Sequence, residues 1–464
     1  MINIKLNYLF ALVLGLVCSA GFHPIHFWLA PIIALGLLYQ ITINLDFKQR
    51  WFISQIFGLG VLAPTQYWTG TYVGNLPWLA LSLMQSFLFV PIGLFLRKNP
   101  KWNPFIFAFG LVTSELLLRT VPFTGFGWSR ISFTQADSPL SFLYPILGCA
   151  GVAFSLAYIA ANRRFSVLLL ISILIFAGNF HKNSVTVTNK IKVALVQGGV
   201  SKLGLDFNAI PQEVFNSHLK ISYQRIKPNE VDLVIWPENS VDIDLFRNEN
   251  VKQKLVDLSS ALNTPILIGG ISRKSADLQN ISVLFDPLPK QIYAKRYLTP
   301  FGEYVPFRKL LSKFNKNVAD VSDFSAGKDT NIFKLESYNL QTLICYELLN
   351  DAFRDQLTAD MIVVQTNNAT FGDTAQLEQE REIARVRAME TNREVAYVST
   401  TGVTSIINKQ GLVIKEIPKF KPDILISSVS LGSNKTLTQK LGLFPELLSV
   451  IMLFLFSVRI RRRN

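Results

Sequence analysis

The stretch Val231-Asp-Leu-Val-Ile-Trp-Pro-Glu238 is a short run of β-branched and apolar residues that ends in a proline and an acid. Such a run is typical of a buried strand. Similar runs recur at residues 191–197, 265–270, 281–285, 340–345, 361–365, 395–399 and 424–429. Between several of these runs lie segments whose apolar residues are spaced as in an amphipathic helix, near residues 210–226, 250–262 and 376–392. This alternation predicts an α/β domain with a mixed or parallel sheet covered by helices.

The rest of the chain is more apolar than this region. The 464 residues are 49% hydrophobic and only 17% charged, whereas an average soluble protein carries about 25% charged residues. Residues 1–180 contain ten Lys/Arg and three acids, residues 181–458 contain 32 and 29, and the last six residues add four Arg. The net charge of +14 therefore lies mainly in the apolar part and the tail. This distribution disfavours a nucleic-acid-binding domain and favours a membrane protein.

Several apolar stretches approach the ~20 residues that a helical membrane span requires. They fall at about 6–22, 27–45, 51–69, 77–96, 103–120, 139–161, 164–180 and 441–458. Lys and Arg occur in every second short connection, whereas residues 22–26 and 70–76 contain none. The positive-inside rule places the basic connections, which hold Lys48, Arg97 and Arg163, in the cytoplasm.

This alternation of charged and uncharged connections predicts three parts of the chain. They are residues 1–180 with seven transmembrane helices, residues 181–440 as one extracytoplasmic domain, and residues 441–464 with an eighth span and a basic cytoplasmic tail. About 260 residues suffice for one domain with its own core. Both termini are then cytoplasmic in a multi-pass protein of the cell membrane. A cleaved signal peptide ending near Cys18-Ser-Ala20 is the alternative for the N-terminus, but it leaves six further spans unexplained.

Few residues of the predicted domain can perform nucleophilic or metal chemistry. His23, His26 and His181 lie at predicted membrane edges, and His218 is the single histidine of the domain. This disfavours a histidine-rich metal site and a Ser-His-Asp triad. The sequence also lacks a GxxxxGK phosphate loop. We therefore expect neither a metal nor a cofactor.

Cys345 is the one cysteine outside the predicted spans, because Cys18 and Cys149 lie within them. A cysteine of this kind is either a small buried core residue or a reactive group. Cys345 stands at the end of an apolar strand and is followed by Tyr346-Glu347. Strand ends are where α/β folds expose reactive side chains.

Two other strand ends carry charges, in Trp236-Pro-Glu238 and in Tyr293-Ala-Lys295. Taken singly, each charge is as expected of an exposed surface residue. Taken with Cys345, they supply a carboxylate base, a cation that favours the thiolate and stabilises an oxyanion, and a nucleophile. This combination predicts acyl-transfer chemistry.

These motifs resemble the nitrilase (carbon–nitrogen hydrolase) superfamily and, more narrowly, the apolipoprotein N-acyltransferase family. The resemblance rests on Trp236-Pro-Glu238, on Tyr293-Ala-Lys-Arg-Tyr-Leu-Thr-Pro-Phe-Gly-Glu-Tyr-Val-Pro306 and on Ile344-Cys-Tyr-Glu347. In the membrane part it rests on Phe123-Thr-Gly-Phe-Gly-Trp128 and Gln135-Ala-Asp-Ser-Pro-Leu140. The predicted layout of spans around one external domain is also that of the family, so the resemblance covers nearly the whole chain.

The resemblance implies an external αββα sandwich with Glu238 as the general base, Lys295 as the oxyanion stabiliser and Cys345 as the nucleophile. Glu303 matches the family's second glutamate beside the lysine. Tyr346 and Glu347 match the pair after the cysteine, and the backbone N–H of Tyr346 is the implied second oxyanion donor.

The implied reaction moves a fatty acyl chain from a membrane phospholipid, through a cysteine thioester, to the α-amino group of a diacylglyceryl-cysteine apolipoprotein. The implied enzyme is a membrane-embedded monomer that binds no nucleic acid. Two tryptophans usual in proteobacterial members are replaced, near Leu205 and near Thr370, as in the actinobacterial branch.

Residues 306–316 place Phe307, Leu310, Leu311 and Phe314 at helical spacing among basic residues. This pattern is typical of an amphipathic arm at the membrane interface and equally of an ordinary core helix.

Two other functions compete with acyl transfer to an amine. A membrane-tethered nitrilase-type amidase would pass the acyl group to water, but tethering requires only one span. A transporter or lipid-binding protein would need several intramembrane charges, whereas Glu115 is the main candidate here.

Overall fold

The computed structural model describes residues 4–97, 101–122, 124–162, 189–274, 277–300, 302–305, 308, 323–432 and 434–461. The predicted span at 164–180, the arm at 306–316 apart from Arg308, and the end of the basic tail lie outside the described residues. The chain forms two compact units. Unit 1 comprises Met1–Thr186, Thr374–Glu382 and Thr436–Asn464, and unit 2 comprises Val187–Asp373 and Ile383–Lys435.

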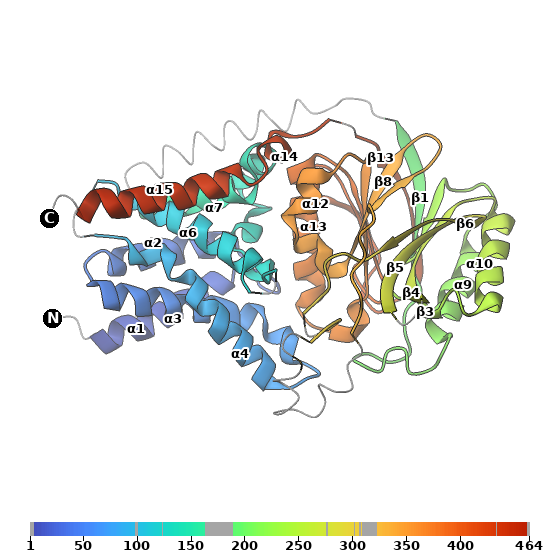
Figure 1. Ribbon diagram of the computed structural model, residues 1–464, viewed down its shortest axis with the longest axis horizontal. Coiled ribbons are helices and arrows are strands. Elements are labelled where there is room, and N and C mark those ends of the chain that lie inside the picture. The colour runs from blue at the N-terminus through green and yellow to red at the C-terminus, as the bar shows by residue number, and fades with distance from the viewer. Residues whose placement is uncertain are drawn as a thin grey trace. The chain divides into compact units, whose positions relative to one another are not determined.

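Unit 1 is built from helices, which follow the apolar stretches of the sequence (Figure 1). They are α1 (Ile4–Ser19), α2 (Leu29–Thr42), α3 (Phe47–Thr65), α4 (Asn75–Ser86), α5 (Pro91–Leu94), α6 (Asn103–Thr120), α7 (Tyr144–Ala161), α14 (Leu437–Leu441) and α15 (Phe444–Arg461). Small residues let two of them approach closely, because a Cβ added at Gly15 of α1 would lie 2.9 Å from the Gly60 carbonyl carbon of α3. Close contact of this kind is typical of helices packed in a membrane.

Two helical segments among the described residues are long and apolar enough to cross a membrane, namely Asn75–Leu94 and Pro139–Ala161. Lys5–Ser19, Leu29–Thr42 and Phe444–Phe456 are apolar but shorter. The predicted stretches 6–22, 27–45, 51–69, 77–96, 103–120 and 139–161 thus coincide with helices. The eight-span topology itself stays a prediction.

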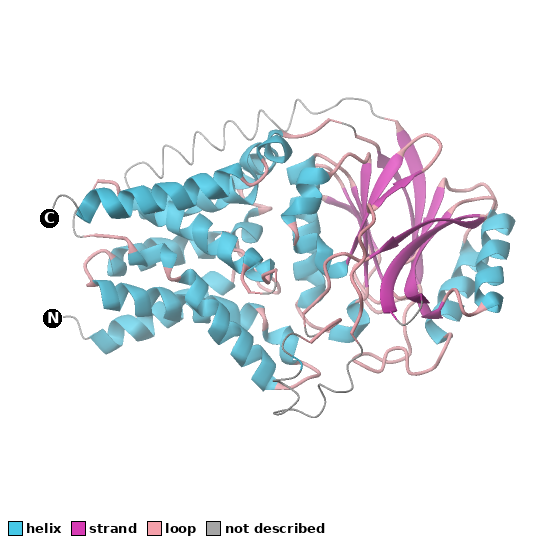
Figure 2. Cartoon of the chain, in the orientation of Figure 1, coloured by secondary structure: helices cyan, strands magenta, loops and turns pink. Residues whose placement is uncertain are grey.

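Unit 2 contains two mixed sheets, seen as the magenta strands of Figure 2. The first has the order β13-β1-β2-β4-β5-β6, with β3 paired to β4, and the second has the order β12-β11-β10-β9-β8-β7. The strands of the first sheet are β1 (Lys190–Gln197), β2 (Leu233–Ile235), β3 (Val241–Asp244), β4 (Ile266–Lys274), β5 (Asp277–Asp286), β6 (Leu288–Ala294) and β13 (Asp423–Ser430). Those of the second are β7 (Ile332–Lys334), β8 (Asn339–Ile344), β9 (Met361–Thr366), β10 (Val395–Ser399), β11 (Ser405–Ile407) and β12 (Val413–Glu416).

The order of the layers follows from the two apolar cores of unit 2. One core joins the sheets face to face and includes Leu195, Leu284 and Val363. The other joins the first sheet to helices α9 (Glu213–Arg225) and α10 (Glu249–Leu262). Helix α12 (Asp351–Gln356) and the Ile383–Thr391 part of α13 (Gln376–Thr391) lie beside the second sheet (Figure 1). The α/β fold with mixed sheets and covering helices is therefore confirmed.

A buried glutamine fastens the two sheets together. Gln365 on β9 donates from Nε2 to the Trp236 carbonyl at 2.7 Å and accepts from the Ser282 hydroxyl at 2.6 Å and the Thr342 hydroxyl at 2.9 Å. Buried polar groups of this kind are satisfied only in one relative placement of their strands, so they specify register. The strand ends after β2 and β8 are thereby held at fixed positions.

Candidate functional site

The three residues predicted to act together each follow a strand. Glu238 comes after β2 and Lys295 directly after β6, both in the first sheet, and Cys345 comes directly after β8 in the second sheet. Residues just past a strand have left the ladder, so their side chains are free to project from the edge of the sheet. The prediction that these residues occupy strand ends is confirmed.

Lys295 is buried between two carboxylates. Its Nζ lies 2.8 Å from Oε2 of Glu303 and 3.6 Å from Oε1 of Glu238. All three side chains are almost inaccessible, with Lys295 only 1% exposed. A buried ammonium needs at least one such partner, because an unpaired charge in the interior is costly. The structure thus brings together Lys295, Glu238 and Glu303 as the sequence motifs indicated.

Asn280 of β5 links the two carboxylates, and the sequence reasoning had not singled it out. Its Nδ2 donates to Oε1 of Glu238 at 2.7 Å and to Oε1 of Glu303 at 2.9 Å. The second oxygen of Glu238 accepts from the backbone N–H of Asn367 at 2.9 Å. An amide at the start of the apolar run 281–285 was the available signal for Asn280.

The two glutamates differ in protonation behaviour because they share one lysine unequally. Burial raises the pKa of Glu238 above its ordinary value, and the more distant Lys295 ammonium does not offset this. Burial acts in the same direction on Glu303, but the close Lys295 contact outweighs it and lowers the pKa of Glu303. Burial alone would lower the pKa of Lys295, and the two carboxylates instead raise it. Lys295 is therefore a permanent cation, and Glu238 is the carboxylate better suited to accept a proton.

Cys345 adopts an unusual backbone conformation. Its φ of 49° lies in the left-handed region, which residues with a side chain rarely adopt. Such conformations cost about 1–3 kcal/mol and cluster at active sites. The side chain is partly exposed, and a thiolate at this position would interact favourably with the Lys295 ammonium. A partly exposed thiol close to a buried ammonium is the setting of a reactive cysteine rather than of an inert core residue.

Glu347 fixes the loop that carries Cys345. Its Oε2 accepts from the backbone N–H of Ile344 at 3.0 Å, and its Oε1 accepts from the Tyr293 hydroxyl at 2.6 Å and the Arg296 N–H at 2.8 Å. One carboxylate thus connects the residue before Cys345 to the segment around Lys295. Tyr346 is buried beside it. The donor role of the Tyr346 N–H stays a prediction.

A second group of buried charges supports the same loop from α12 and α13. Arg387 donates to the carbonyls of Leu348 and Leu349 at 2.8 and 3.1 Å, just beyond Cys345. Arg387 also contacts Asp351 at 2.6 Å. Arg354 contacts Glu390 at 3.1 Å, and Glu390 pairs with Arg387 as well. We call Asp351, Arg354, Arg387 and Glu390 the arginine network.

The two segments where expected tryptophans are replaced lie side by side. The Gly204 N–H donates to the Ala369 carbonyl at 2.8 Å, and Phe207 packs in a small core with Ala369 and Val214. Leu205 is 56% exposed on this surface. The replacements near Leu205 and Thr370 therefore belong to one feature of unit 2.

His218 takes no part in the cluster around Lys295. It is buried in α9, where its Nε2 accepts from the Gly198 N–H at 3.1 Å and its Nδ1 lies 2.8 Å from the Val214 carbonyl. Burial lowers the pKa of His218 to about 4. A neutral, hydrogen-bonded imidazole of this kind is structural, as the sequence analysis expected when it set aside a Ser-His-Asp triad.

Comparison with known families matches both parts of the chain. Residues 14–162 match the apolipoprotein N-acyltransferase N-terminal domain, and residues 192–438 match the carbon–nitrogen hydrolase family.

Curated relatives match over nearly the full length. An apolipoprotein N-acyltransferase from Wigglesworthia glossinidia brevipalpis is 29% identical and covers 97% of this chain and 97% of its own. One from Mycolicibacterium smegmatis is also 29% identical and covers 94% of this chain and 82% of its own. Among solved structures, a CN-hydrolase superfamily protein from Xanthomonas campestris with an arsenic adduct in its active site has a TM-score of 0.41 and 19% identity, covering 52% of this chain and 91% of that one.

Proposed function

Because the chain belongs to the carbon–nitrogen hydrolase family, in its apolipoprotein N-acyltransferase branch, we propose that Cys345, Lys295 and Glu238 are its catalytic residues. Its activity is that of an acyltransferase that acts on apolipoproteins. The observation that carries the residue assignment is the unequal sharing of Lys295, which leaves Glu238 as a buried carboxylate with a raised pKa.

In the first step Glu238 takes the proton of the Cys345 thiol, and the thiolate attacks the ester carbonyl of a membrane phospholipid. The C–S bond forms, and the carbonyl oxygen of the ester becomes an oxyanion, which the Lys295 ammonium and the Tyr346 N–H stabilise. The ester C–O bond then breaks, and Glu238 returns its proton to the departing lysophospholipid. The product on the enzyme is a thioester at Cys345.

In the second step the α-amino group of a diacylglyceryl-cysteine apolipoprotein attacks the carbonyl carbon of the thioester, and a C–N bond forms. Glu238 accepts a proton from the attacking amine, the C–S bond breaks, and the Cys345 thiolate recovers a proton from Glu238. Lys295 stabilises the oxyanion in both steps, and Glu303 keeps Lys295 charged and in place by its 2.8 Å contact. Glu347 acts as a positioning residue, because it connects the Cys345 loop to the segment after β6.

The proposal is tested by detecting the thioester intermediate on Cys345. Full-length protein incubated with acyl-labelled phospholipid should acquire a hydroxylamine-sensitive label, and the Cys345→Ala variant should acquire none. Retention of the label by Cys345→Ala would show that Cys345 is not the nucleophile. Adding a diacylglyceryl-cysteine lipopeptide should then convert the label into N-acylated lipopeptide. Release as free fatty acid would instead indicate the amidase-type hydrolase, and neither product would indicate a binding or transport protein.

The site is proposed to face the outside of the cell membrane, on a domain of residues 181–440 between seven spans and an eighth. The distribution of Lys and Arg among the connections supports this topology. Single cysteines introduced at Lys101 and at Tyr72, in a background without Cys18, Cys149 and Cys345, separate the two sides. A membrane-impermeant thiol reagent should label Tyr72→Cys in intact cells and Lys101→Cys only after permeabilisation.

A further inference from the structure

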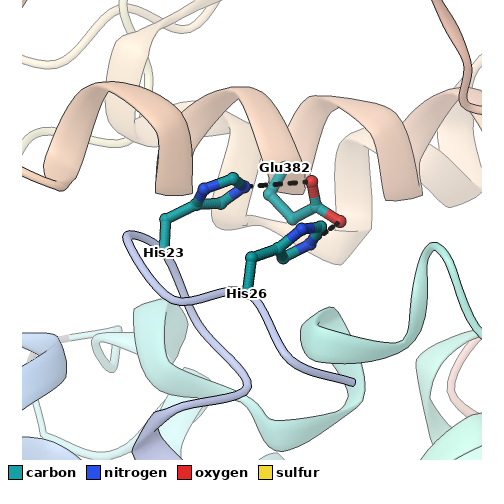
Figure 3. A group of neighbouring side chains, drawn as sticks. All are labelled: His23, His26 and Glu382. Atoms are coloured by element: carbon teal, nitrogen blue, oxygen red, sulfur yellow. Dashed lines mark ion pairs between the residues drawn. The ribbon is translucent and has the colours of Figure 1, made fainter. Parts of the chain in front are cut away.

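Three side chains of unit 1 converge outside the site around Lys295. His23 and His26 lie on the connection between α1 and α2, and Glu382 lies on α13 (Figure 3). Nε2 of His23 is 3.7 Å from Oε2 of Glu382, and Nε2 of His26 is 3.2 Å from Oε1. The Glu382 side chain is only 7% exposed, and those of the two histidines are 17% and 19% exposed. Two imidazoles thus meet opposite oxygens of one buried carboxylate.

Neighbouring residues hold this arrangement in place. Gln379, one helical turn before Glu382, donates from Nε2 to the His23 carbonyl at 2.9 Å and accepts from the Trp128 indole N–H at 2.6 Å. Oδ2 of Asp137 lies 3.6 Å from Nδ1 of His26, on the side of the ring that faces away from Glu382. A carboxylate on the far nitrogen of an imidazole is the usual second contact of a metal-ligating histidine, because it orients the ring and makes the other nitrogen a better donor.

Two imidazole nitrogens and one carboxylate oxygen form a donor set that zinc commonly takes in proteins. The candidate ligand atoms all lie within 4.8 Å of one another. Ligands around a tetrahedral ion with bonds of about 2.1 Å are about 3.4 Å apart, so a contraction of at most about 1.4 Å closes the site. The rings stand nearly parallel, with centroids 4.1 Å apart and 11° between their planes, so the two rings must turn relative to each other before both lone pairs point to one ion.

A divalent cation would bind both rings and Glu382 at once, through one nitrogen of each ring and a carboxylate oxygen. Nothing in the sequence indicated this cluster, because Glu382 lies more than 350 residues after His23 and His26 in the chain.

We propose that His23, His26 and Glu382 bind a divalent transition-metal ion of the zinc class, with Asp137 orienting His26 and a fourth position open to water. The ion would fasten the connection between α1 and α2 to the first turns of α13, segments far apart in the sequence. Because an ion that binds only the folded protein stabilises it by mass action, zinc should raise the thermal stability of the protein. This proposal does not depend on the catalytic roles assigned to Cys345, Lys295 and Glu238.

The test uses the full-length protein in detergent, stripped with a chelator and then dialysed against micromolar Zn²⁺. We expect one Zn²⁺ per chain, a higher thermal midpoint with Zn²⁺ than without, and the visible absorption of a tetrahedral site after loading with Co²⁺. Glu382→Gln and His26→Ala should lose the bound ion and the stabilisation. Asp137→Asn should weaken Zn²⁺ binding by about 10–100-fold, and Glu416→Gln, a carboxylate on the exposed strand β12, should bind as the unaltered protein does.

Equal Zn²⁺ content in Glu382→Gln, His26→Ala and the unaltered protein would overturn the proposal, as would the absence of binding at micromolar Zn²⁺. Loss of fold is separated from loss of ligand by the metal-free thermal midpoint. Glu382→Gln retains the size of the side chain, so its metal-free midpoint should match that of the stripped protein while its response to Zn²⁺ disappears.

Discussion

Two groups of buried charges lie on either side of the Cys345 loop in sequence, and they are balanced differently. The arginine network pairs two arginines with Asp351 and Glu390, so its fully buried charges cancel, and Arg354 also contacts the partly exposed Asp355 at 2.7 Å. The group around Lys295 contains one cation and two carboxylates, Glu238 and Glu303. Among the residues that the structure describes, the second group therefore carries a surplus carboxylate in the interior.

The difference separates structural from chemical use of buried charge. In the balanced network, neighbouring carboxylates hold the pKa of Arg354 above its ordinary value despite burial, so no proton is available to move. Around Lys295, Glu303 has the closer contact with the ammonium, and burial leaves the pKa of Glu238 raised. A carboxylate whose charged form is incompletely compensated can take up a proton at moderate cost. The imbalance is what suits Glu238 to acid–base work.

Among substitutions of the buried carboxylates, Glu238→Gln should have the largest effect on activity. It removes the proton acceptor while keeping the size of the side chain, so formation of the Cys345 thioester should fall about a thousandfold. The rate of label incorporation from phospholipid measures this. The thermal midpoint should stay the same or rise, because the substitution removes the surplus buried charge.

Glu303→Gln is the matched control, since it removes a carboxylate from the same cluster. It leaves Lys295 with Glu238 as its one carboxylate partner, so the pKa of Glu238 should fall. Activity should then drop less than in Glu238→Gln. An equal or larger loss in Glu303→Gln would mean that Glu303, and not Glu238, accepts the proton.

The substitution Arg387→Met should have the largest effect on stability. It leaves the charges of Asp351 and Glu390 buried with one arginine between them, which costs about 3–5 kcal/mol. The thermal midpoint in detergent should fall by several degrees. The bonds to the Leu348 and Leu349 carbonyls are also lost, so thioester formation should decline with the loss of the folded loop. If the midpoint stays unchanged while activity disappears, Arg387 belongs to the chemistry and the contrast between the two groups fails.

The strands that position the Lys295 cluster were predictable because each is a buried apolar run bounded by turn residues. β1, β2, β4, β5, β8, β9, β10 and β13 all overlap the runs read from the sequence. The runs did not include β6, whose end at Lys295 was predicted but whose first five residues are exposed or half-buried. They also missed β3, β7, β11 and β12, which are three or four residues long. Short strands carry too few side chains for a periodic pattern, and β12 is mostly exposed, so it lacks the apolar signal altogether.

The charged site residues were predictable from their position after strands, but their relations to one another were not. Which carboxylate lies 2.8 Å from Lys295 depends on the path of residues 299–303, and no sequence pattern encodes that distance. Asn280 was missed because it resembles any polar residue at a strand end. Glu382 was missed for a different reason: its partners His23 and His26 are far from it in the sequence, so their proximity appears only in the folded chain.

Asn280→Ala should have an intermediate effect, visible in the pH dependence. Asn280 donates to the charged form of Glu238, so its loss raises the pKa of Glu238 further. Because the base must be deprotonated to act, kcat/KM rises with pH through the pKa of Glu238, and the acid limb of the variant should lie at higher pH. A hydrogen bond to a charged group contributes about 1.5 kcal/mol, so activity below the limb should fall about tenfold.

The same variant should regain most of its activity above the acid limb, where Glu238 is ionised in both proteins. Asn280→Asp is the informative companion, because it adds a third carboxylate to the cluster and should suppress activity across the whole range. A uniform loss in Asn280→Ala at every pH would show that Asn280 only positions β5 and does not set the proton affinity of Glu238.

Disrupting the ion pair between Asp286 and Lys290 should have the smallest effect. It shows what an exposed ion pair contributes, for comparison with the buried pair of Lys295 and Glu303. Nζ of Lys290 lies 2.8 Å from Oδ2 of Asp286, the same separation as between Lys295 and Glu303, and β6 carries Lys290 a few residues before Lys295. Both side chains of the pair are exposed, so water solvates each charge whether or not the partner is present. Lys290→Met should change neither the thermal midpoint nor the rate of thioester formation measurably, whereas Lys295→Met, with the same loss of charge, should abolish thioester formation. If the two substitutions gave similar losses, geometry alone would decide the strength of these pairs, and burial would not distinguish the Lys295 cluster from the surface.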